Sequence, residues 1–468
     1  MFRIVFVAPL IWATLYFSSH RAAAQMPRGP VHFKPAGHVL GDVHPYFHNG
    51  ECFLFYLTPQ RYESSLVRSA DLLHWRPAQL SHRAQQQRDW LQPYFVLGVF
   101  FDPQAKLFRS FYGTGGGRMA SSASRDLLQW ECGLREFHVP PAKYYQQRRD
   151  PYIFWIPARK QYGCVMTTQM NDGVSRGAVT LATSHDLKHW TDHGAIIRTG
   201  EHLPECPQIF QLGERWYALA SIQEAGPQHS GVGQPSYWIG ESPLGPWSAK
   251  PHGVLDGRHL CAAQVARDGE NLHLFGWIPL RAAARNESKS WGGHLALPRE
   301  VLALPDGTLK TRLAPKLQKT WDKLAQPGMA DFDISSASRF TGVSWPLRNT
   351  TLFANFDLGL PARDRAVHIE LQNLGEIVFN TDRVEVVDAQ GEMRSAIDVD
   401  LTDLQKCEVR LVVEDDIIEV FVAERWSLAA RVTSQGGECR LSFSSDGGTG
   451  RVESLRHLVL KHDSPDTE

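Results

Sequence analysis

Three acidic residues occur at related places in the first half of the chain. Asp42 precedes Val-His-Pro-Tyr-Phe, Asp150 precedes Pro-Tyr-Ile-Phe-Trp, and Glu205 precedes Cys-Pro-Gln-Ile-Phe. Each acid therefore begins a strand-like run of aromatic and branched residues. Paired carboxyl groups are the usual equipment of a glycosidase: a separation of about 5 Å suits a retaining mechanism, and a wider one suits an inverting mechanism. We take Asp42, Asp150 and Glu205 as candidate catalytic residues.

A repeat runs through the same region. Four similar segments end in Trp75, Trp130, Trp190 and Trp247, and the intervals between these residues are 55, 60 and 57. Units of about this length suit a four-stranded propeller blade or a longer helical repeat. Short β-branched and aromatic runs separated by turn residues fill each unit, and no segment there keeps a helical apolar period. The repeat therefore predicts an all-β fold, with a five-bladed β-propeller over residues 31–317.

The acids also recur in step with the repeat. They lie 108 and 55 residues apart, which corresponds to two units and one unit. Because the first strand of each propeller blade lines the central channel, equivalent positions on these strands should converge. Taken singly, each acid has another interpretation, since Asp before Pro is an ordinary turn residue. Taken together, the spacing predicts three acids facing one another in a central funnel.

Other repeated residues have structural interpretations. Asp71, Asp126 and Asp186 precede the repeat Trp residues and should cap turns, while the Trp residues pack between blades. His44 follows Asp42 closely and is either a ligand contact or a packing residue. The His residues show no H-E-x-x-H or comparable spacing, so the sequence predicts neither a metal site nor a cofactor.

A second domain follows the repeat. Residues 314–324 form the best helical stretch, and we expect a linker over residues 318–330. From residue 331 to residue 463 the sequence alternates strands and turns, as in 351–356, 366–371, 408–413 and 417–422. Strands at this spacing predict a C-terminal β-sandwich.

The N-terminus has the layout of a secretory signal peptide. A short basic start precedes an apolar run from Ile4 to Phe17, and Ala22-Ala23-Ala24 offers a cleavage site before Gln25. The run is shorter than the roughly 20 residues that a membrane span needs. An N-terminal anchor is the alternative. We expect residues 1–24 to be removed and the protein to be secreted or periplasmic, without a membrane segment.

The charge balance limits the classes of binding partner, and the cysteine content limits the possible disulfides. The chain has 49 Lys plus Arg and 50 Asp plus Glu, a net charge of -1, which excludes binding of nucleic acid by bulk electrostatics. Seven cysteines are present without a C-x-x-C pair, so at least one is free or intermolecular. Cys407 and Cys439 are the candidate disulfide, and most of the others should be buried thiols. The sequence carries no indication of the oligomeric state.

Three blocks of the chain resemble those of glycoside hydrolase family 32. They are Arg149-Asp150-Pro151, Glu205-Cys206-Pro207 and Trp291-Gly-Gly-His-Leu-Ala-Leu-Pro-Arg-Glu300, and the segment 416–422 is similar to the family's second domain. The family includes invertases, inulinases and levanases, and its members have a five-bladed propeller followed by a β-sandwich. The resemblance covers nearly the whole mature chain and implies an oligo- or polysaccharide substrate.

The resemblance also implies roles for the acids. Asp42 matches the nucleophile, Glu205 the general acid/base, and Asp150 the residue that stabilises the transition state by holding sugar hydroxyls. We take Arg149, His44 and Trp291 as candidate substrate-binding residues. Arg149 has the alternatives of packing or of pairing with a channel acid.

The chain departs from the family at the nucleophile block. The family usually reads Trp-Met-Asn-Asp-Pro-Asn-Gly, whereas this chain reads Val39-Leu-Gly-Asp42-Val-His-Pro45. The Asp is kept, but the flanking Trp and Asn are absent. The resemblance as a whole leads us to expect a secreted retaining hydrolase of fructofuranosyl linkages in sucrose, levan or inulin. The alternatives are another furanoside as substrate, an inverting furanosidase of the arabinan-hydrolase type, a transferase, and a sugar-binding propeller without turnover.

Overall fold

The computed structural model describes residues 29–58, 64–84, 97–115, 118–132, 145–174, 176–223, 233–280, 291–360 and 365–463. Nearly all of its regular structure is β-strand, which confirms the expected all-β class. The predicted signal peptide, residues 1–24, lies outside the described residues. Among those that are described, no helix has the length and apolar character needed to cross a bilayer.

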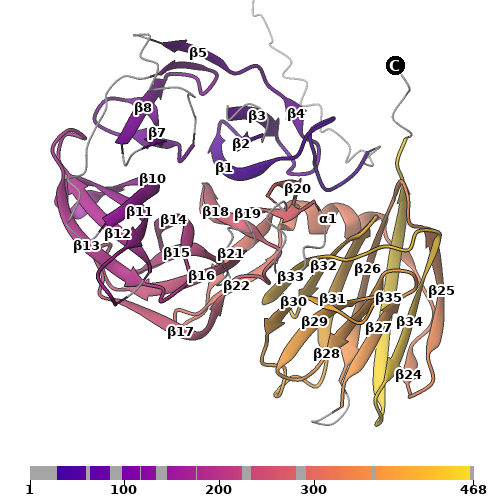
Figure 1. Cartoon of the computed structure of the whole chain (residues 1–468). Helices are drawn as coiled ribbons and strands as arrows, with labels where there is room; N and C mark the ends of the chain where they lie inside the picture. The colour runs from indigo at the N-terminus through magenta and orange to yellow at the C-terminus, as the bar shows by residue number, and fades with distance from the viewer. Residues whose placement is uncertain are drawn as a thin grey trace, which may run out of the picture.

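Five successive sheets of four or five strands make up the N-terminal part, and Figure 1 shows them arranged around a ring. The first contains β1 (Gly41–His48), β2 (Glu51–Leu57), β3 (Ser64–Ser69) and β4 (Arg76–Pro77). The second contains β5 (Ser81–Ala84), β6 (Phe100–Asp102), β7 (Leu107–Gly115), β8 (Arg118–Ser124) and β9 (Gln129–Cys132). The third contains β10 (Tyr145–Ile156), β11 (Gln161–Met170), β12 (Gly177–Ser184) and β13 (Thr191–Arg198). The fourth contains β14 (Pro204–Leu212), β15 (Arg215–Gln223), β16 (Gly233–Gly240) and β17 (Trp247–Val254). The fifth contains β18 (Cys261–Asp268), β19 (Asn271–Pro279), β20 (Gly293–Leu295), β21 (Arg299–Ala303) and β22 (Leu309–Leu313).

The first strands of four of these sheets, β1, β10, β14 and β18, lie toward the centre of the ring, whereas β5 of the second sheet lies at the outer edge (Figure 1). Strand β14 packs beside β10 and β18, and β18 packs beside β1, so the last sheet meets the first (Figure 1). Consecutive strands within the first, third and fourth sheets pair antiparallel. Residues on four strands that are far apart in sequence are thereby brought to one axis.

The turn-capping role expected of the repeat acids is confirmed. Asp71 Oδ1 accepts hydrogen bonds from the backbone N–H groups of Leu73 and His74, at 3.0 and 2.8 Å. Asp126 and Asp186 accept the equivalent bonds in their own turns. Such Asx turns hold the tight connection between the two strands that flank each acid. The repeat therefore marks connections between successive strands.

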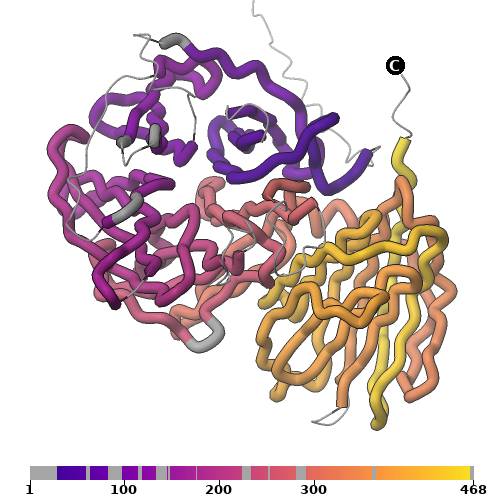
Figure 2. Tube along the Cα trace, viewed as in Figure 1, coloured from indigo at the N-terminus to yellow at the C-terminus, as the bar shows by residue number. Residues whose placement is uncertain are grey.

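Two larger sheets form the C-terminal part. One contains β23 (Gln326–Pro327), β24 (Phe332–Ile334), β26 (Thr350–Gly359), β31 (Cys407–Glu414), β32 (Ile417–Val422), β33 (Trp426–Arg431) and β35 (Gly450–Lys461). The other contains β25 (Arg339–Pro346), β27 (Val367–Leu371), β28 (Gly375–Phe379), β29 (Arg383–Asp388), β30 (Met393–Asp398) and β34 (Glu438–Ser445). Alternate residues of both sheets bury a shared core, as expected for a β-sandwich. Figure 2 follows the chain from the ring into this sandwich.

The helix expected near residue 314 is present as α1 (Pro315–Leu324). Its Leu317 and Trp321 are buried, and the Trp321 ring lies 4.6 Å from that of Phe353 on β26. The segment predicted as a linker is thus packed against both parts of the molecule, and it already contains β23.

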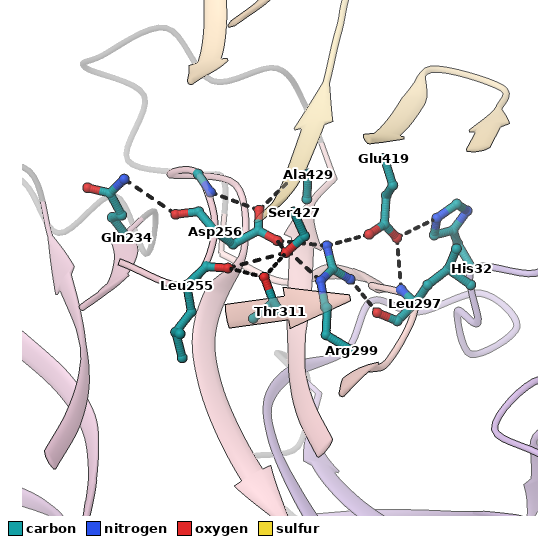
Figure 3. Close-up of polar contacts among 11 residues, drawn as sticks. His32, Gln234, Leu255, Asp256, Leu297, Arg299, Thr311, Glu419, Ser427 and Ala429 are labelled. Carbon is teal, nitrogen blue, oxygen red and sulfur yellow. Dashed lines mark hydrogen bonds and ion pairs between the residues drawn. The ribbon is translucent and has the colours of Figure 1, made fainter. Parts of the chain in front are cut away.

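A buried polar network joins the ring to the sandwich (Figure 3). The Arg299 guanidinium pairs with Asp256 at 3.0 Å and with Glu419, and all three side chains are fully buried. Glu419 also contacts His32 Nε2 at 2.9 Å, and Ser427 donates to Asp256 at 2.7 Å. Burial of charge is costly unless opposite charges and hydrogen bonds compensate it. Here the cost of burying these charges is offset only while the ring and the sandwich remain packed together, because Asp256 and Arg299 belong to one and Glu419 to the other.

The network predicts a pH window of maximal stability. Burial by itself lowers the pKa of His32, but Glu414 and Glu419 raise it from 6.5 to about 9. The stabilisation from charged His32 is therefore complete below about pH 6.5 and is lost as the pH rises through 9. Burial raises the pKa of Glu414, but His32 lowers it from 4.5 to about 2, so its contribution is lost as the pH falls below 4.5.

We expect the difference in Tm between the wild type and His32→Asn to be largest between about pH 4.5 and 6.5 and to shrink toward pH 9. Differential scanning calorimetry across this range measures it. The exposed His38 provides a matched control, since His38→Asn should leave Tm unchanged. A constant difference for His32→Asn from pH 5 to 9 would contradict the prediction.

The disulfide expected between Cys407 and Cys439 is wrong. All seven cysteines are buried free thiols. Cys407 lies on β31 and Cys439 on β34, which belong to the two opposing sheets of the sandwich. Facing sheets are about 10 Å apart, whereas a disulfide requires Cα atoms within about 7 Å. The prediction for the remaining cysteines, buried thiols, is confirmed.

Candidate active site

A repeated β-bulge shapes the start of the inner strands. The pairing register shifts directly after Gly41 on β1, Arg149 on β10, Glu205 on β14 and Cys261 on β18. The next residue of each strand has a positive φ: 45° at Asp42, 53° at Asp150, 48° at Cys206 and 45° at Ala262. Such angles are uncommon for residues other than glycine and persist only where the surroundings impose them. Bulges re-aim side chains, and these four do so around one axis.

The bulge corrects the predicted register of the acids. Asp42 and Asp150 occupy the positive-φ position, but on β14 that position belongs to Cys206. Glu205 stands one residue earlier and is equivalent to Arg149. The prediction of three equivalent acids is therefore wrong by one residue at Glu205. Because a bulge sets two residues of one strand against one of its partner, neighbouring residues can serve the same site.

Arg149 bridges two of the acids. Its Nη2 donates to Glu205 Oε1 at 2.7 Å, and its Nε lies 3.4 Å from Asp150 Oδ2. The side chains are partly exposed, at 30% for Arg149, 29% for Asp150 and 22% for Glu205, so a ligand can reach them. The structure thus brings Arg149, Asp150 and Glu205 together from adjacent strands.

Asp150 is held by neutral donors as well. The Thr167 hydroxyl on β11 and the backbone N–H of Cys206 on β14 both donate to Asp150 Oδ2, at 3.3 Å. The two bonds leave Oδ1 without a described contact in this part of the chain. A carboxylate anchored through one oxygen can present the other to sugar hydroxyls.

Asp42 completes the group from β1. Burial raises the pKa of Asp42 to about 8, and the negative charges of Glu205 and Asp150 act in the same direction. Arg149 and a hydrogen bond from the side chain of Trp291 act to lower it. The repulsion between Asp42 and both other acids means that the three lie close enough for their charges to interact. The convergence expected from the spacing is therefore what the fold produces.

Glu205 has a different set of neighbours. Burial raises the pKa of Glu205, and Asp150 raises it further, while Arg149 and the side chain of Gln223 act to lower it. Closely spaced carboxyl groups titrate as a set and do not all ionise together. Burial and the neighbouring acids therefore favour the neutral forms of both Asp42 and Glu205, while Arg149, Trp291 and Gln223 oppose this effect.

His44 is placed differently from the acids. It is buried, and its Nδ1 accepts a hydrogen bond from the Gly98 backbone N–H at 2.9 Å. Burial lowers the pKa of His44 to about 3, although a hydrogen bond with Gln264 opposes this. Its described contacts join the first sheet to the second and fifth. These bonds hold His44 as a neutral side chain between the first sheet and its neighbours, and its contact with substrate stays a prediction.

A cavity of about 700 Å³ opens along the later residues of the inner strands. His44, Phe47, Trp155, Gln208 and Arg267 are among its lining residues, which include none of the three acids. The inner strands run away from the acids toward this cavity, so it lies farther along the same channel.

Several residues of the site were not predicted from the sequence. Thr167 and Gln223 sit on second strands, where no pattern distinguishes them from other strand residues. Gly41 was visible only as the missing Asn of the family block. Within the described ranges, no group of three or more His, Cys, Asp and Glu side chains is arranged to hold a metal ion.

Comparisons with known proteins agree on the family. Residues 32–313 match the family model described as the glycosyl hydrolases family 32 N-terminal domain. A comparison with curated protein sequences found no match.

Solved structures are similar over nearly the whole chain. A β-fructofuranosidase of the family from Bombyx mori is 19% identical, with 92% of this chain and 93% of that one covered at a TM-score of 0.66. An exo-inulinase from Aspergillus awamori is 18% identical, with 93% and 98% covered at a TM-score of 0.67. A fructan 1-exohydrolase from Cichorium intybus, solved with 1-kestose, is 14% identical, with 93% and 98% covered at a TM-score of 0.67.

The identities are low, and these structures therefore support the fold, while the family model covers more than half of the sequence. The resemblance stated from the three sequence blocks is confirmed. The chain belongs to glycoside hydrolase family 32 and is a glycoside hydrolase.

Proposed function

We propose that this protein is an exported, retaining glycoside hydrolase that releases fructose from fructofuranosyl linkages. The observation that carries the proposal is the cluster of Asp42, Asp150 and Glu205, with Arg149 between two of its members. We also propose that the five sheets of the ring are the blades of a five-bladed propeller. The inner-strand bulge, repeated at Asp42, Asp150, Cys206 and Ala262, supports this arrangement.

The mechanism assigns one task to each acid. Asp42 attacks the anomeric carbon and forms a covalent glycosyl–enzyme ester, while Glu205 transfers its proton to the leaving oxygen. Glu205 then accepts a proton from water, and that water displaces Asp42 and releases the sugar. Asp150, anchored by Thr167 and Cys206, holds sugar hydroxyls as charge develops on the ring.

The two chemical roles demand opposite protonation states. Asp42 must be ionised and Glu205 protonated when the substrate is cleaved. The reaction therefore needs one proton on the pair formed by Asp42 and Glu205, and that proton must be on Glu205. Arg149 pairs with Glu205 at 2.7 Å and therefore favours its ionised form in the free protein. Contacts that favour ionised Asp42 are consequently needed for the reactive form.

Related structures indicate the substrate class. One similar structure is a β-fructofuranosidase in complex with sucrose, and another is a fructan exohydrolase in complex with 1-kestose. We propose sucrose, inulin and levan as the substrates to test first. Gly41 stands where the family usually has Asn, so aryl furanosides of other sugars belong in the same panel.

The product anomer tests the mechanism. We expect proton NMR during the first minutes of hydrolysis to show β-fructose, because two displacements retain configuration. An initial α-anomer from the same β-linked substrate would contradict retention and support the inverting furanosidase. Added alcohol should yield a transfer product if the covalent intermediate forms, since a second acceptor can then replace water.

The altered nucleophile block keeps one further candidate open, a sugar-binding propeller. Calorimetry that shows fructan binding, together with no product after prolonged incubation of the same samples, would favour this candidate over the hydrolase.

Export is proposed from the N-terminal residues alone. A basic start, the apolar run from Ile4 to Phe17 and the small residues before Gln25 support it. Sequencing the N-terminus of the protein recovered outside the cytoplasm tests this proposal, with Gln25 expected as the first residue. A product that retains Met1 in the membrane fraction would contradict it.

A further inference from the structure

Trp291 lies directly against the residues that begin β1. The backbone of Leu40 exchanges hydrogen bonds with that of Gly293, at 2.8 and 3.2 Å, which fixes the segment that carries Trp291 beside the nucleophile strand. The Trp291 ring packs against the core between ring and sandwich, and its centroid lies 6.1 Å from that of Trp277. The indole is therefore held on both sides before any substrate arrives.

Gly41 makes this approach possible. A Cβ atom at Gly41 would lie 2.6 Å from Cζ2 and 2.8 Å from Cη2 of the Trp291 ring. Real Cβ atoms do not come so close to other heavy atoms, so any larger residue would displace the ring. The residue that replaces the family's Asn is thus the one that creates room for the indole next to Asp42.

The contact has a direction that suits the proposed chemistry. An indole N–H can donate a hydrogen bond but cannot accept one. It can therefore stabilise a carboxylate, but it cannot accept a hydrogen bond from the O–H group of a neutral carboxylic acid. The cationic neighbour of Asp42, Arg149, pairs with Asp150 and Glu205 as well and cannot favour Asp42 alone. Among the groups that act on Asp42, Trp291 is the donor that does not also contact Glu205.

We propose that Trp291 is a positioning residue for the nucleophile: its indole N–H donates to the Asp42 carboxylate, and Gly41 provides the space. Trp291 thereby favours the ionised form of Asp42 against the effects of burial and of the two neighbouring acids, and so favours a proton on Glu205, as the first displacement requires. This inference rests on the role proposed for Asp42.

Other groups face Asp42 and must be kept constant in any test. They are Arg149 and Asp150 from β10, Glu205 and Cys206 from β14, and Cys261 from β18. Burial raises the pKa of both thiols, so these remain neutral across the working range. The variants below leave all of these groups in place.

The decisive variant is Trp291→Phe, which keeps an aromatic ring and removes the donor. Trp277→Phe is its matched control, because Trp277 lies in the same cluster and its indole nitrogen has no partner among the described residues. We expect Trp291→Phe to move the acidic limb of the kcat/KM profile upward by about one pH unit. At the acidic end, kcat/KM should fall about tenfold, with a smaller change at the optimum. Trp277→Phe should leave the acidic limb in place.

A second readout does not depend on turnover. Carbon-13 NMR of protein labelled at the Asp carboxyl carbon follows the titration of Asp42, whose signal is identified by its loss in Asp42→Asn. We expect Trp291→Phe and Gly41→Ala to shift this titration upward and Trp277→Phe to leave it unchanged. An unchanged titration in Trp291→Phe overturns the inference even if the wild type is active. A wild type without hydrolase activity, but with the expected shift, contradicts the proposed function and leaves the contact established.

Discussion

Replacing Glu205 by Gln should lower kcat on sucrose or a fructan by at least about three orders of magnitude. The amide keeps the size of the side chain and its contact with Arg149 Nη2, but it can neither donate the proton to the leaving oxygen nor activate water. The effect should be largest for substrates with a poor leaving group. An aryl fructofuranoside with a good leaving group should form the covalent intermediate more readily, because its departure needs less help from an acid.

The control for this variant is Glu201→Gln. Glu201 is exposed and lies in the turn just before β14, so the same chemical change is made four residues away. Its kinetics should match those of the wild type. Addition of azide to Glu205→Gln with the activated substrate should restore turnover and yield a fructosyl azide, because a small anion can replace the activated water. Equal rates for Glu205→Gln and the wild type would remove Glu205 from the acid/base role.

Replacing Arg299 by Met should lower the free energy of unfolding by about 3–5 kcal/mol. Arg299 is fully buried between Asp256 and Glu419, and its removal leaves two buried carboxyl groups without their cation (Figure 3). Burial raises the pKa of Glu419, and Arg299 is the strongest influence that keeps it below its ordinary value. Without Arg299 these groups must take up protons or the interface must open. Urea unfolding followed by Trp fluorescence measures the change.

Arg451→Met is the matched control for the loss of an arginine ion pair. Arg451 also pairs with two carboxylates, Asp333 and Glu453, but its side chain is 47% exposed. Water solvates the partners after substitution, so the urea midpoint should not change measurably. Similar midpoints for Arg299→Met and the wild type would mean that the buried network contributes little to the joining of ring and sandwich.

The amino-acid sequence was sufficient for the class of fold and for the family. Alternating apolar runs separated by turn residues are local patterns, and they predicted an all-β chain, the helix near residue 314 and the Asx turns at Asp71, Asp126 and Asp186. The three family blocks led to glycoside hydrolase family 32. Spacing also indicated that Asp42, Asp150 and Glu205 converge, since steps of whole repeats bring residues to nearly the same place on successive inner strands, although Glu205 is displaced by one residue.

Other features depended on contacts between segments distant in sequence. A one-residue shift at a bulge depends on backbone angles, which no pattern in this sequence predicts. The sequence therefore did not reveal that Cys206, and not Glu205, is the equivalent of Asp42 and Asp150. The predicted disulfide failed because Cys407 and Cys439 lie on opposing sheets, a separation that strand patterns do not encode. The bond between His44 and Gly98, 54 positions away, likewise follows no pattern in the sequence.

Both the acid cluster and the buried network between ring and sandwich depend on the packing of segments that are distant in the sequence. Trp291 reaches Asp42 only because the chain returns to β1 in the fifth sheet and because Gly41 has no side chain. Arg299 pairs with Glu419 across 120 residues only when ring and sandwich are assembled. Local sequence determined the strands, the turns and the identities of the acids. The tertiary structure alone decided which donors face which carboxylates, because such pairs form only in the packed chain.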